Sequence, residues 1–293
     1  LKKQNVGVVC GCGIRGIEKT AKGFTFHTKG GDFYATKCIM ATGGKTLKKS
    51  GSDGSGFLYL ESLGHHIIDL VPGLIGLKGK QSFFADIAGI RADVKVDLYI
   101  ESTHVCSEQG ELQLTNYGIS GIPVFQLSRI ATRALSEQKK VYATLNFVPF
   151  WEKEQCLTYF KERFKKADEK HIGEALIGFF PEKLIPVLLE ESHIKAAKYA
   201  NRLQTEELER FIDTVQGLRV DITDWNTFDT AQVTAGGVDT DEIDAETMES
   251  KLCPGLYFAG EMVDIDGICG GYNLQWAWSS GAVAGIHVAR ELS

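Results

Sequence analysis

Three glycine-rich segments, each at the end or the start of an apolar stretch, have residue types suited to binding a flat or phosphorylated ligand. Residues 42–44 (Thr-Gly-Gly) follow the apolar run 38–40, and residues 260–261 (Gly-Glu) follow the apolar run 256–258. Residues 270–275 open an uncharged stretch. Glycine lets a backbone approach a ligand closely, and an uncharged helix start presents free N–H groups and a positive dipole end. These segments predict a site for a phosphate or an electron-rich carbonyl, with Glu261 able to accept hydrogen bonds from a ribose-like polyol.

A fourth glycine pattern, residues 11–16 (Gly-Cys-Gly-Ile-Arg-Gly), matches the dinucleotide-binding fingerprint letter for letter. That fingerprint needs a helix of about a dozen residues directly after it and an acidic residue about 20 positions on. Here Lys22-Gly23 arrives too early for such a helix, and β-forming residues follow. We therefore expect a glycine-rich β-turn. An NAD dehydrogenase that binds its nucleotide at this turn is the alternative.

The other polar clusters favour surface positions over chemistry. His65 and His66 lack a third ligand at metal-binding spacing, which favours exposed histidines. The acidic run 239–246 lacks the glycine and glutamate positions of a calcium loop, which predicts a solvated surface. No Gly-X-Ser-X-Gly elbow supports a hydrolase, and residues 51–56 are expected to form only a polar glycine loop. The sequence predicts no metal site.

Apolar periodicity predicts the elements that must hold the glycine-rich segments. We expect strands at 6–10, 17–19, 24–28 and 33–40, and a short helix at 54–63 that ends before Gly64. Short strands with turns are expected over 74–115, a helix over 123–137 and a strand over 141–148. Residues 151–214 predict a helical subdomain, and strand and glycine character returns at 218–222, 234–238 and 256–259.

The stretch 268–289 contains no charged residue and is long enough to span a bilayer. Polar side chains along it and two glycines near its start argue against a membrane span. We expect instead a buried helix from about Asn273, in which Gly281 and Gly285 allow a close approach to a sheet.

The composition is that of a globular protein. With 293 residues, 43% of them apolar and 24% charged, the chain is neither disordered nor a coiled coil. Its 32 glycines against six prolines fit turns that approach a ligand better than flexible linkers. A net charge of -6 provides no electrostatic footprint for nucleic acid, so no nucleic-acid partner is expected. Seven cysteines without a Cys-X-X-Cys pair predict a reducing, cytoplasmic location, and no signal peptide or membrane association is expected.

Several motifs together carry a resemblance to a known family. They are Thr-Ala-Gly-Gly-Val at 234–238, Gly-Leu-Tyr-Phe-Ala-Gly-Glu at 255–261, Asp-Ile-Asp-Gly at 264–267 and Gly-Gly-Tyr-Asn-Leu-Gln-Trp at 270–276. Gly-Glu-Leu-Gln-Leu-Thr-Asn-Tyr-Gly at 110–118 lies in the middle of the chain. The chain resembles the bacterial FAD-binding flavoproteins of the aminoacetone-oxidase type, within the glutathione-reductase-like and fumarate-reductase-like superfamily.

The resemblance implies an α/β and α+β architecture and a flavin enzyme. Residues 1–73 and 227–293 would form a partial FAD-binding domain, residues 74–150 a β-rich insertion domain and residues 151–226 a helical subdomain. The activity implied is FAD-dependent hydride transfer on a small organic substrate. The amides of Asn273 and Leu274 would face the flavin O2 and N1 edge, and Glu261 or Asp264 would approach the ribityl or pyrophosphate region. The expected cofactor-binding residues are Thr42, Gly43, Gly44, Thr234, Gly236, Gly237, Gly260, Glu261, Asp264, Gly271, Tyr272, Asn273, Leu274 and Gln275.

Two departures from the family pattern qualify that expectation. Family members begin with a strand, a Gly-X-Gly-X-X-Gly turn and a helix that hold the ADP half of FAD, and we find no such unit in this chain, which starts at Leu1. Many relatives carry a histidine where this chain has Asn116 and an acid where it has Ser55. The catalytic acid or base is therefore unknown. Tyr117 and Tyr272 are candidates because a phenol can donate a proton.

From the missing unit we expect this chain on its own to be apo, to bind FAD weakly or not at all, and to be catalytically silent. The edges of residues 38–42 and 256–259 would be exposed and would invite self-association with another copy. A non-enzymatic binding or interaction module with a vestigial flavin site is the alternative. The substrate stays open between amino ketones and unsaturated steroid acids.

Overall fold

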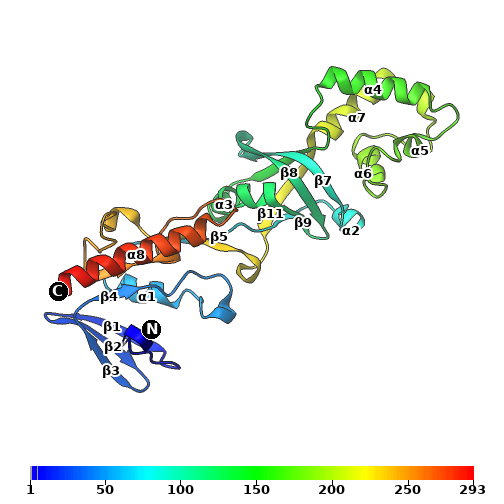
Figure 1. The fold of residues 1–293 in the computed structure, drawn as a ribbon. Helices are drawn as coiled ribbons and strands as arrows, with labels where there is room; N and C mark the ends of the chain where they lie inside the picture. Colours follow the sequence, from blue (N-terminus) through cyan, green and yellow to red (C-terminus); the bar gives the residue numbers. More distant parts are fainter. Residues whose placement is uncertain (1, 5) are drawn as a thin grey trace. The chain divides into compact units, whose positions relative to one another are not determined.

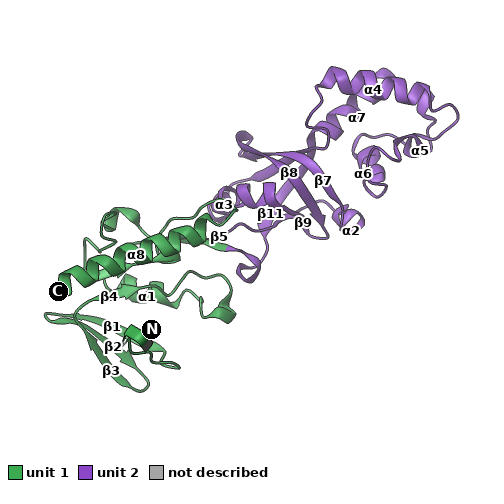
Figure 2. Ribbon diagram, viewed as in Figure 1, with its two compact units in different colours: residues 1–70, 233–293 green, residues 71–232 purple. Residues whose placement is uncertain are grey.

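The computed structural model describes residues 2–4 and 6–293 and has a mixed α and β fold (Figure 1). The chain divides into two compact units (Figure 2). Unit 1 comprises residues 1–70 and 233–293, and unit 2 comprises residues 71–232.

Unit 1 starts with a short 3-10 turn, η1 (Lys2–Gln4), and a three-stranded antiparallel sheet made of β1 (Ile14–Thr20), β2 (Gly23–Thr28) and β3 (Gly31–Ala35). The strand expected at 6–10 is wrong: these residues form no strand and are exposed. Apolar β-forming residues become a strand only where a neighbouring strand pairs with them, and none of the described strands pairs with this segment. The glycine pattern 11–16 runs directly into β1, which confirms that no nucleotide-binding helix follows it.

The expected strand 33–40 is split, and its second half belongs to a parallel pair at the centre of unit 1. β4 (Cys38–Met40) lies beside β13 (Leu256–Phe258), with Cys38 opposite Leu256. A second pair joins β5 (Ile67–Gly73) to β12 (Val233–Val238). The expected open edge at 256–259 is wrong, because Phe258 N–H donates to Met248 O at 3.0 Å and Ser250 N–H donates to Leu256 O at 2.7 Å. All three β13 side chains are buried.

Two helices flank these strands. α1 (Ser55–Ser62) ends as expected, with Gly64 at φ 93° just beyond it. α8 (Tyr272–Leu292) starts one residue before the expected Asn273. The expectation that α8 is buried is wrong: only Ser280 and Ala284 are buried, whereas Trp278 is 69% exposed. The uncharged sequence was taken to indicate burial, but whether a helix is buried depends on the elements that pack against it. No helix in the described part of the chain has the length and apolar character needed to cross a membrane.

Unit 2 contains a closed barrel in the strand order β10-β11-β6-β9-β8-β7. Its strands are β6 (Leu77–Gly79), β7 (Arg91–Ile100), β8 (Thr103–Thr115), β9 (Gly118–Gly121), β10 (Val141–Asn146) and β11 (Leu218–Trp225). Only short strands were expected before residue 115, but β7 has 10 residues and β8 has 13. Gly110 does not interrupt β8 because it pairs with Val94 across the sheet. α2 (Phe84–Ile87) and α3 (Ile122–Ser136) accompany the barrel, and α3 confirms the helix expected at 123–137.

The helical region expected over 151–214 consists of α4 (Lys153–Lys165), α5 (Ile172–Leu176), α6 (Leu184–Glu191) and α7 (Thr205–Gly217). The helices are confirmed, and a separate subdomain stays a prediction. Its buried side chains and those of the barrel form one continuous apolar cluster. Phe160 is fully buried among the rings of Phe179, Phe180 and Phe211, with centroids between 4.9 and 6.1 Å away.

Candidate functional site

Glu261 joins three distant segments of unit 1 at the carboxyl end of the β4–β13 pair. It lies in the 3-10 turn η6 (Gly260–Met262) directly after β13. One carboxylate oxygen, Oε1, accepts the N–H of Thr234 at 2.7 Å, and the other, Oε2, accepts the N–H of Gly44 at 3.0 Å. The hydroxyl oxygen of Thr234 accepts the N–H of Lys45 at 2.7 Å. We call these four residues, Gly44, Lys45, Thr234 and Glu261, the Glu261 cluster.

Burial raises the pKa of the Glu261 carboxyl above its ordinary value, although the hydrogen bonds from Thr234 and Gly44 act in the opposite direction. A carboxylate that accepts two backbone N–H groups is held in a fixed position. Glu261 was expected to accept hydrogen bonds from a cofactor polyol. Two of its acceptor positions serve the protein itself, and its contact with a cofactor stays a prediction.

Two of the expected site glycines, Gly44 and Gly236, lie where neighbouring segments of the chain come very close together. A Cβ on Gly44 would lie 2.3 Å from the Thr234 hydroxyl and 2.6 Å from a Glu261 oxygen. Gly236 has φ 100°, and a Cβ there would lie 2.4 Å from the Asp69 carbonyl oxygen. Side chains are excluded at both positions, so the glycine signal in the sequence reports the close packing of β12 and of the loop after β4.

Asp264, Thr42 and Gly237 extend the Glu261 cluster. A carboxylate oxygen of Asp264 accepts the N–H of Gly236 at 3.0 Å. The Thr42 hydroxyl donates to the sulfur of the buried Met262 at 2.9 Å, and Gly237 packs on the Met262 carbonyl. The structure thus brings the expected residues of the β4, β12 and β13 segments together. The sequence did not single out Met262.

The start of α8 is open to a ligand. Gly271 occupies the N-cap at φ 91°, no side chain caps the helix and its first turn carries no acid. Asn273 is directed elsewhere, because its amide oxygen accepts the Gly267 N–H at 2.8 Å and its amide nitrogen donates to the Gly267 carbonyl at 2.9 Å. Free backbone N–H groups at a helix start suit an electron-rich oxygen. This end of α8 therefore offers N–H groups to such an oxygen, and its contact with a flavin stays a prediction.

α8 is attached to the Glu261 cluster through Gly260. The indole N–H of Trp276 donates to the Gly260 carbonyl at 3.0 Å, and the Gly260 N–H donates to the Ser280 hydroxyl at 2.9 Å. The expected residues Tyr272 and Leu274 are exposed, at 59% and 61%, and Gln275 bonds within the helix to Ser279. Gly43, with φ 74°, lies beside Ser52.

A cavity of about 450 Å³ lies in unit 1 beside the Glu261 cluster, with Lys45 common to both. Its acidic side chains are Asp53, Glu61 and Asp69, and hydrogen bonds from Ser55 lower the pKa of Asp53. From the sequence, this region was predicted only to form a polar loop followed by a helix. The lining residues are Lys45, Asp53, Gly54, Ser55, Phe57, Leu58, Glu61, Ile67, Asp69 and Leu70.

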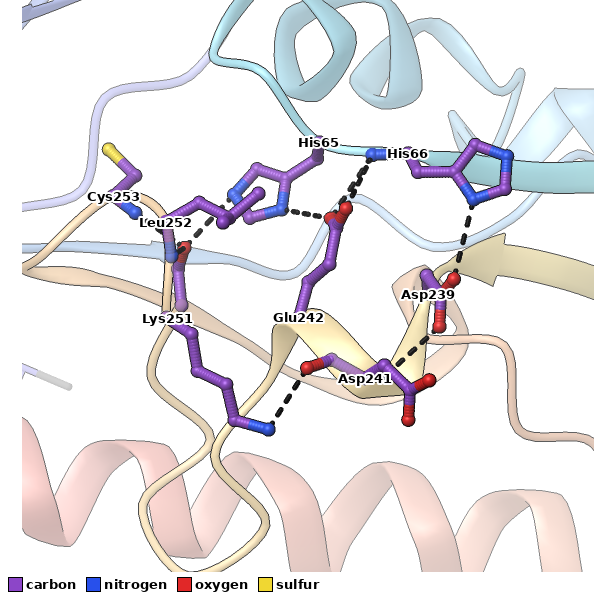
Figure 3. A network of polar contacts seen from close by, with 9 residues as sticks. His65, His66, Asp239, Asp241, Glu242, Lys251, Leu252 and Cys253 are labelled. Atoms are coloured by element: carbon purple, nitrogen blue, oxygen red, sulfur yellow. Dashed lines mark hydrogen bonds and ion pairs between the residues drawn. The ribbon is translucent and has the colours of Figure 1, made fainter.

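The two adjacent histidines differ, and the expectation that both are exposed is wrong. His65 is 4% exposed, and its ring bonds to Glu242 at 2.8 Å and to Ser250 at 3.1 Å (Figure 3). Glu242 belongs to the acidic run that was expected to be solvated, yet its carboxylate lies between the His65 ring and the His66 backbone (Figure 3). His66 is exposed. Within residues 2–4 and 6–293, no group of three or more potential ligands could hold a metal ion.

The two tyrosines considered as proton donors lie in different units. Tyr272 stands at the exposed start of α8 in unit 1. Tyr117 is half-buried in the β8–β9 turn of unit 2. A catalytic role for either stays a prediction.

A family model described as the HI0933-like protein Rossmann domain matches residues 1–287. The chain belongs to this family. It is an FAD-binding oxidoreductase family, so the coarser part of the resemblance is confirmed, and the narrower aminoacetone-oxidase type stays a prediction.

Three curated relatives give the family a chemical context. A 3-dehydro-bile acid delta(4,6)-reductase of Clostridium scindens is 43% identical over 285 residues, which cover 97% of this chain and 70% of that protein. Ribosomal RNA dihydrouridine synthases of Escherichia coli and Haemophilus influenzae are each 28% identical and cover 91% and 92% of this chain. The chain spans 64% of the length of each of these two synthases.

Proposed function

We propose that this chain is the greater part of an FAD-dependent reductase that saturates a carbon–carbon double bond conjugated to a carbonyl group. Two observations in a chain of an FAD-binding family carry the proposal: the Glu261 cluster, which is attached through Gly260 to Trp276 and Ser280 of α8, and the open start of that helix. The cluster fixes the loops after β4 and β13, and the helix start offers N–H groups to an oxygen.

The names of the relatives support this reaction class. In a 3-dehydro-bile acid the Δ4 and Δ6 double bonds are conjugated to the 3-oxo group, and in uridine the reducible double bond is conjugated to a ring carbonyl. One name specifies a steroid acid and the other an RNA base, so what they share is the conjugated double bond. We assign that shared chemistry to this chain.

The residues that would hold the cofactor are those of the Glu261 cluster and the α8 start. FAD, once reduced by a hydride donor such as a reduced nicotinamide, would supply a hydride to the carbon β to the carbonyl. The N–H groups at the start of α8 stabilise negative charge on an oxygen placed there. Tyr272, exposed at the same helix end, is the candidate donor of the proton that the substrate takes up.

The cavity beside Lys45 bears on substrate choice. Three carboxylates and one ammonium group line it, together with the apolar side chains of Phe57, Leu58, Ile67 and Leu70. This negative balance disfavours an acid and favours a neutral or amine-bearing substrate with an apolar body. Amino ketones are therefore the second substrate class to be tested beside steroid enones.

The test uses the natural protein at its full length. It is purified, examined for a yellow chromophore and reduced without oxygen, and a steroid enone, its saturated counterpart and an amino ketone are then added. We expect the enone to restore the oxidised flavin spectrum and the saturated compound to leave it unchanged. If the enone does not reoxidise the flavin and the amino ketone, added to the oxidised protein, bleaches it, amino ketone oxidation would replace our reaction class. A protein that stays colourless with added FAD would support the binding-module alternative.

A further inference from the structure

We infer that His65 is a positioning residue of the proposed site: a buried relay of Glu242, His65 and Ser250 holds it neutral, with its proton on Nδ1. The side chain of His65 has no exposed surface. Its Nδ1 lies 2.8 Å from a Glu242 oxygen and its Nε2 lies 3.1 Å from the Ser250 hydroxyl. The assignment to the reaction rests on the proposed function, whereas the proton assignment does not.

The hydrogen-bond count at Ser250 decides which nitrogen carries the proton. The hydroxyl oxygen accepts the N–H of Cys253 at 2.8 Å and the N–H of Leu252 at 3.0 Å (Figure 3). A hydroxyl group has two lone pairs and one hydrogen. Both lone pairs are engaged, so the remaining O–H is donated to His65 Nε2. The proton of the imidazole is then on Nδ1, where it is donated to Glu242.

The order acid, histidine, serine is also that of a hydrolytic triad, but this relay is not built to attack a substrate. Ser250 is 4% exposed, and its oxygen is occupied by two backbone donors. Its hydroxyl oxygen is therefore not available as a nucleophile, and we assign the relay an effect on the segments that carry it.

Those segments lead to the Glu261 cluster. His65 joins α1 to β5, Glu242 follows β12, and Ser250 lies beside β13. The His65 ring and the Phe258 ring of β13 pack in a T-shaped arrangement, with centroids 5.2 Å apart and planes at 85°. Phe258 is three residues before Glu261. The relay therefore fixes the strand from which Glu261 reaches Gly44 and Thr234.

The first measurement is the protonation of the His65 ring in the whole 15N-labelled chain at neutral pH, by long-range proton–nitrogen correlation. We expect a protonated Nδ1 and an unprotonated Nε2. A proton on Nε2, or a doubly protonated ring, would overturn the assignment. This measurement needs neither flavin nor turnover, so its failure is distinct from failure of the proposed reaction.

The second measurement follows the amide signals of Gly44 and Thr234, which donate to Glu261, in His65→Asn and His65→Gln. Each variant can keep one of the two ring contacts, and we expect both amide signals to shift. The matched control is His66→Asn, since His66 is the exposed neighbour, and it should leave both signals in place. If the His65 variants lower only the urea midpoint, His65 supports the fold alone and the positioning role is wrong. Glu242→Gln, which keeps an acceptor oxygen, provides the same readout should the His65 variants not fold.

Discussion

Unit 1 and unit 2 are each stabilised internally by a different kind of interaction. In unit 2, aromatic and aliphatic side chains of the barrel and the helices pack into one continuous apolar cluster. In unit 1 the apolar cluster is smaller, and the loops of the candidate site are held by a few side-chain oxygens that accept backbone N–H groups. Apolar packing spreads its contribution over many contacts, whereas a buried acceptor concentrates it in one group. We therefore expect the stability of unit 2 to fall when a large buried side chain is truncated. We expect the stability of unit 1 to fall when one hydrogen-bond acceptor is displaced.

The largest effect is expected from Phe160→Ala in unit 2. The ring of Phe160 is fully buried among four other phenylalanine rings, and its removal leaves a cavity that should cost about 3–5 kcal/mol of unfolding free energy. Urea unfolding followed by tryptophan fluorescence measures the change. Phe150→Ala is the control, because this side chain is 77% exposed, and should change stability by no more than about 0.5 kcal/mol. Equal losses in both variants would mean that buried ring volume is not what stabilises unit 2.

Gly44→Ala tests the close approach in unit 1. The added methyl group would overlap the Thr234 hydroxyl and a Glu261 oxygen, and forcing the loop apart should cost about 1–3 kcal/mol. In the full-length protein we also expect weaker flavin binding, measured by flavin fluorescence. Gly285→Ala in α8 is the matched control, since a Cβ there has open space. It should stabilise the protein by roughly 0.5–1 kcal/mol.

A pair of tryptophans two positions apart in α8 sharpens the comparison within one helix. Trp276 donates its indole N–H to the Gly260 carbonyl, so Trp276→Phe should cost roughly 1 kcal/mol. Trp278 is 69% exposed, and Trp278→Phe should have an effect below about 0.5 kcal/mol. Thermal unfolding of the two variants in the same buffer gives the difference. A larger loss for Trp278→Phe would mean that the exposed face of α8, not its attachment to Gly260, stabilises unit 1.

Sequence reasoning succeeded where a signal is local. The 3.6-residue pattern located α3 and the helices of 151–214, and the premature Lys22-Gly23 correctly excluded a nucleotide-binding helix after Gly16. Glycines after apolar runs located the loops that meet at Glu261. These signals are contained in a few consecutive residues.

It failed where burial depends on a distant partner. His65 is buried because Glu242, 177 positions away, accepts its ring proton, and no pattern around His65 encodes that pairing. The segment 6–10 has the residues of a strand, but none of the strands that the structure describes pairs with it. α8 carries no charged residue before Arg290, yet it is mostly exposed. In each case local composition was taken to indicate an environment that only tertiary packing determines.

The smallest effect expected is a change in pH dependence for Glu261→Gln. Because burial raises the pKa of Glu261 in the folded state, the folded protein holds this proton more tightly than the unfolded chain. The stability contributed by that proton is fully present below the unfolded pKa and is lost as pH rises through the folded pKa. We therefore expect the stability of the unsubstituted chain, relative to Glu261→Gln, to fall as pH rises above about 4.5, the ordinary pKa of a glutamate carboxyl.

Glu261→Gln also removes one carboxylate acceptor from the N–H of Gly44 or Thr234. This loss shifts the plot of unfolding free energy against pH as a whole and does not change its slope. One proton limits that slope to roughly 1.4 kcal/mol per pH unit. Unfolding in urea at a series of pH values, subtracted between the two proteins, isolates it. Glu246→Gln, at an exposed position, is the control. If the stability of the unsubstituted chain relative to Glu261→Gln rose with pH, the two backbone N–H donors would outweigh the effect of burial on the pKa of Glu261. The N–H groups of Gly44 and Thr234 would then hold the Glu261 carboxylate in its charged form.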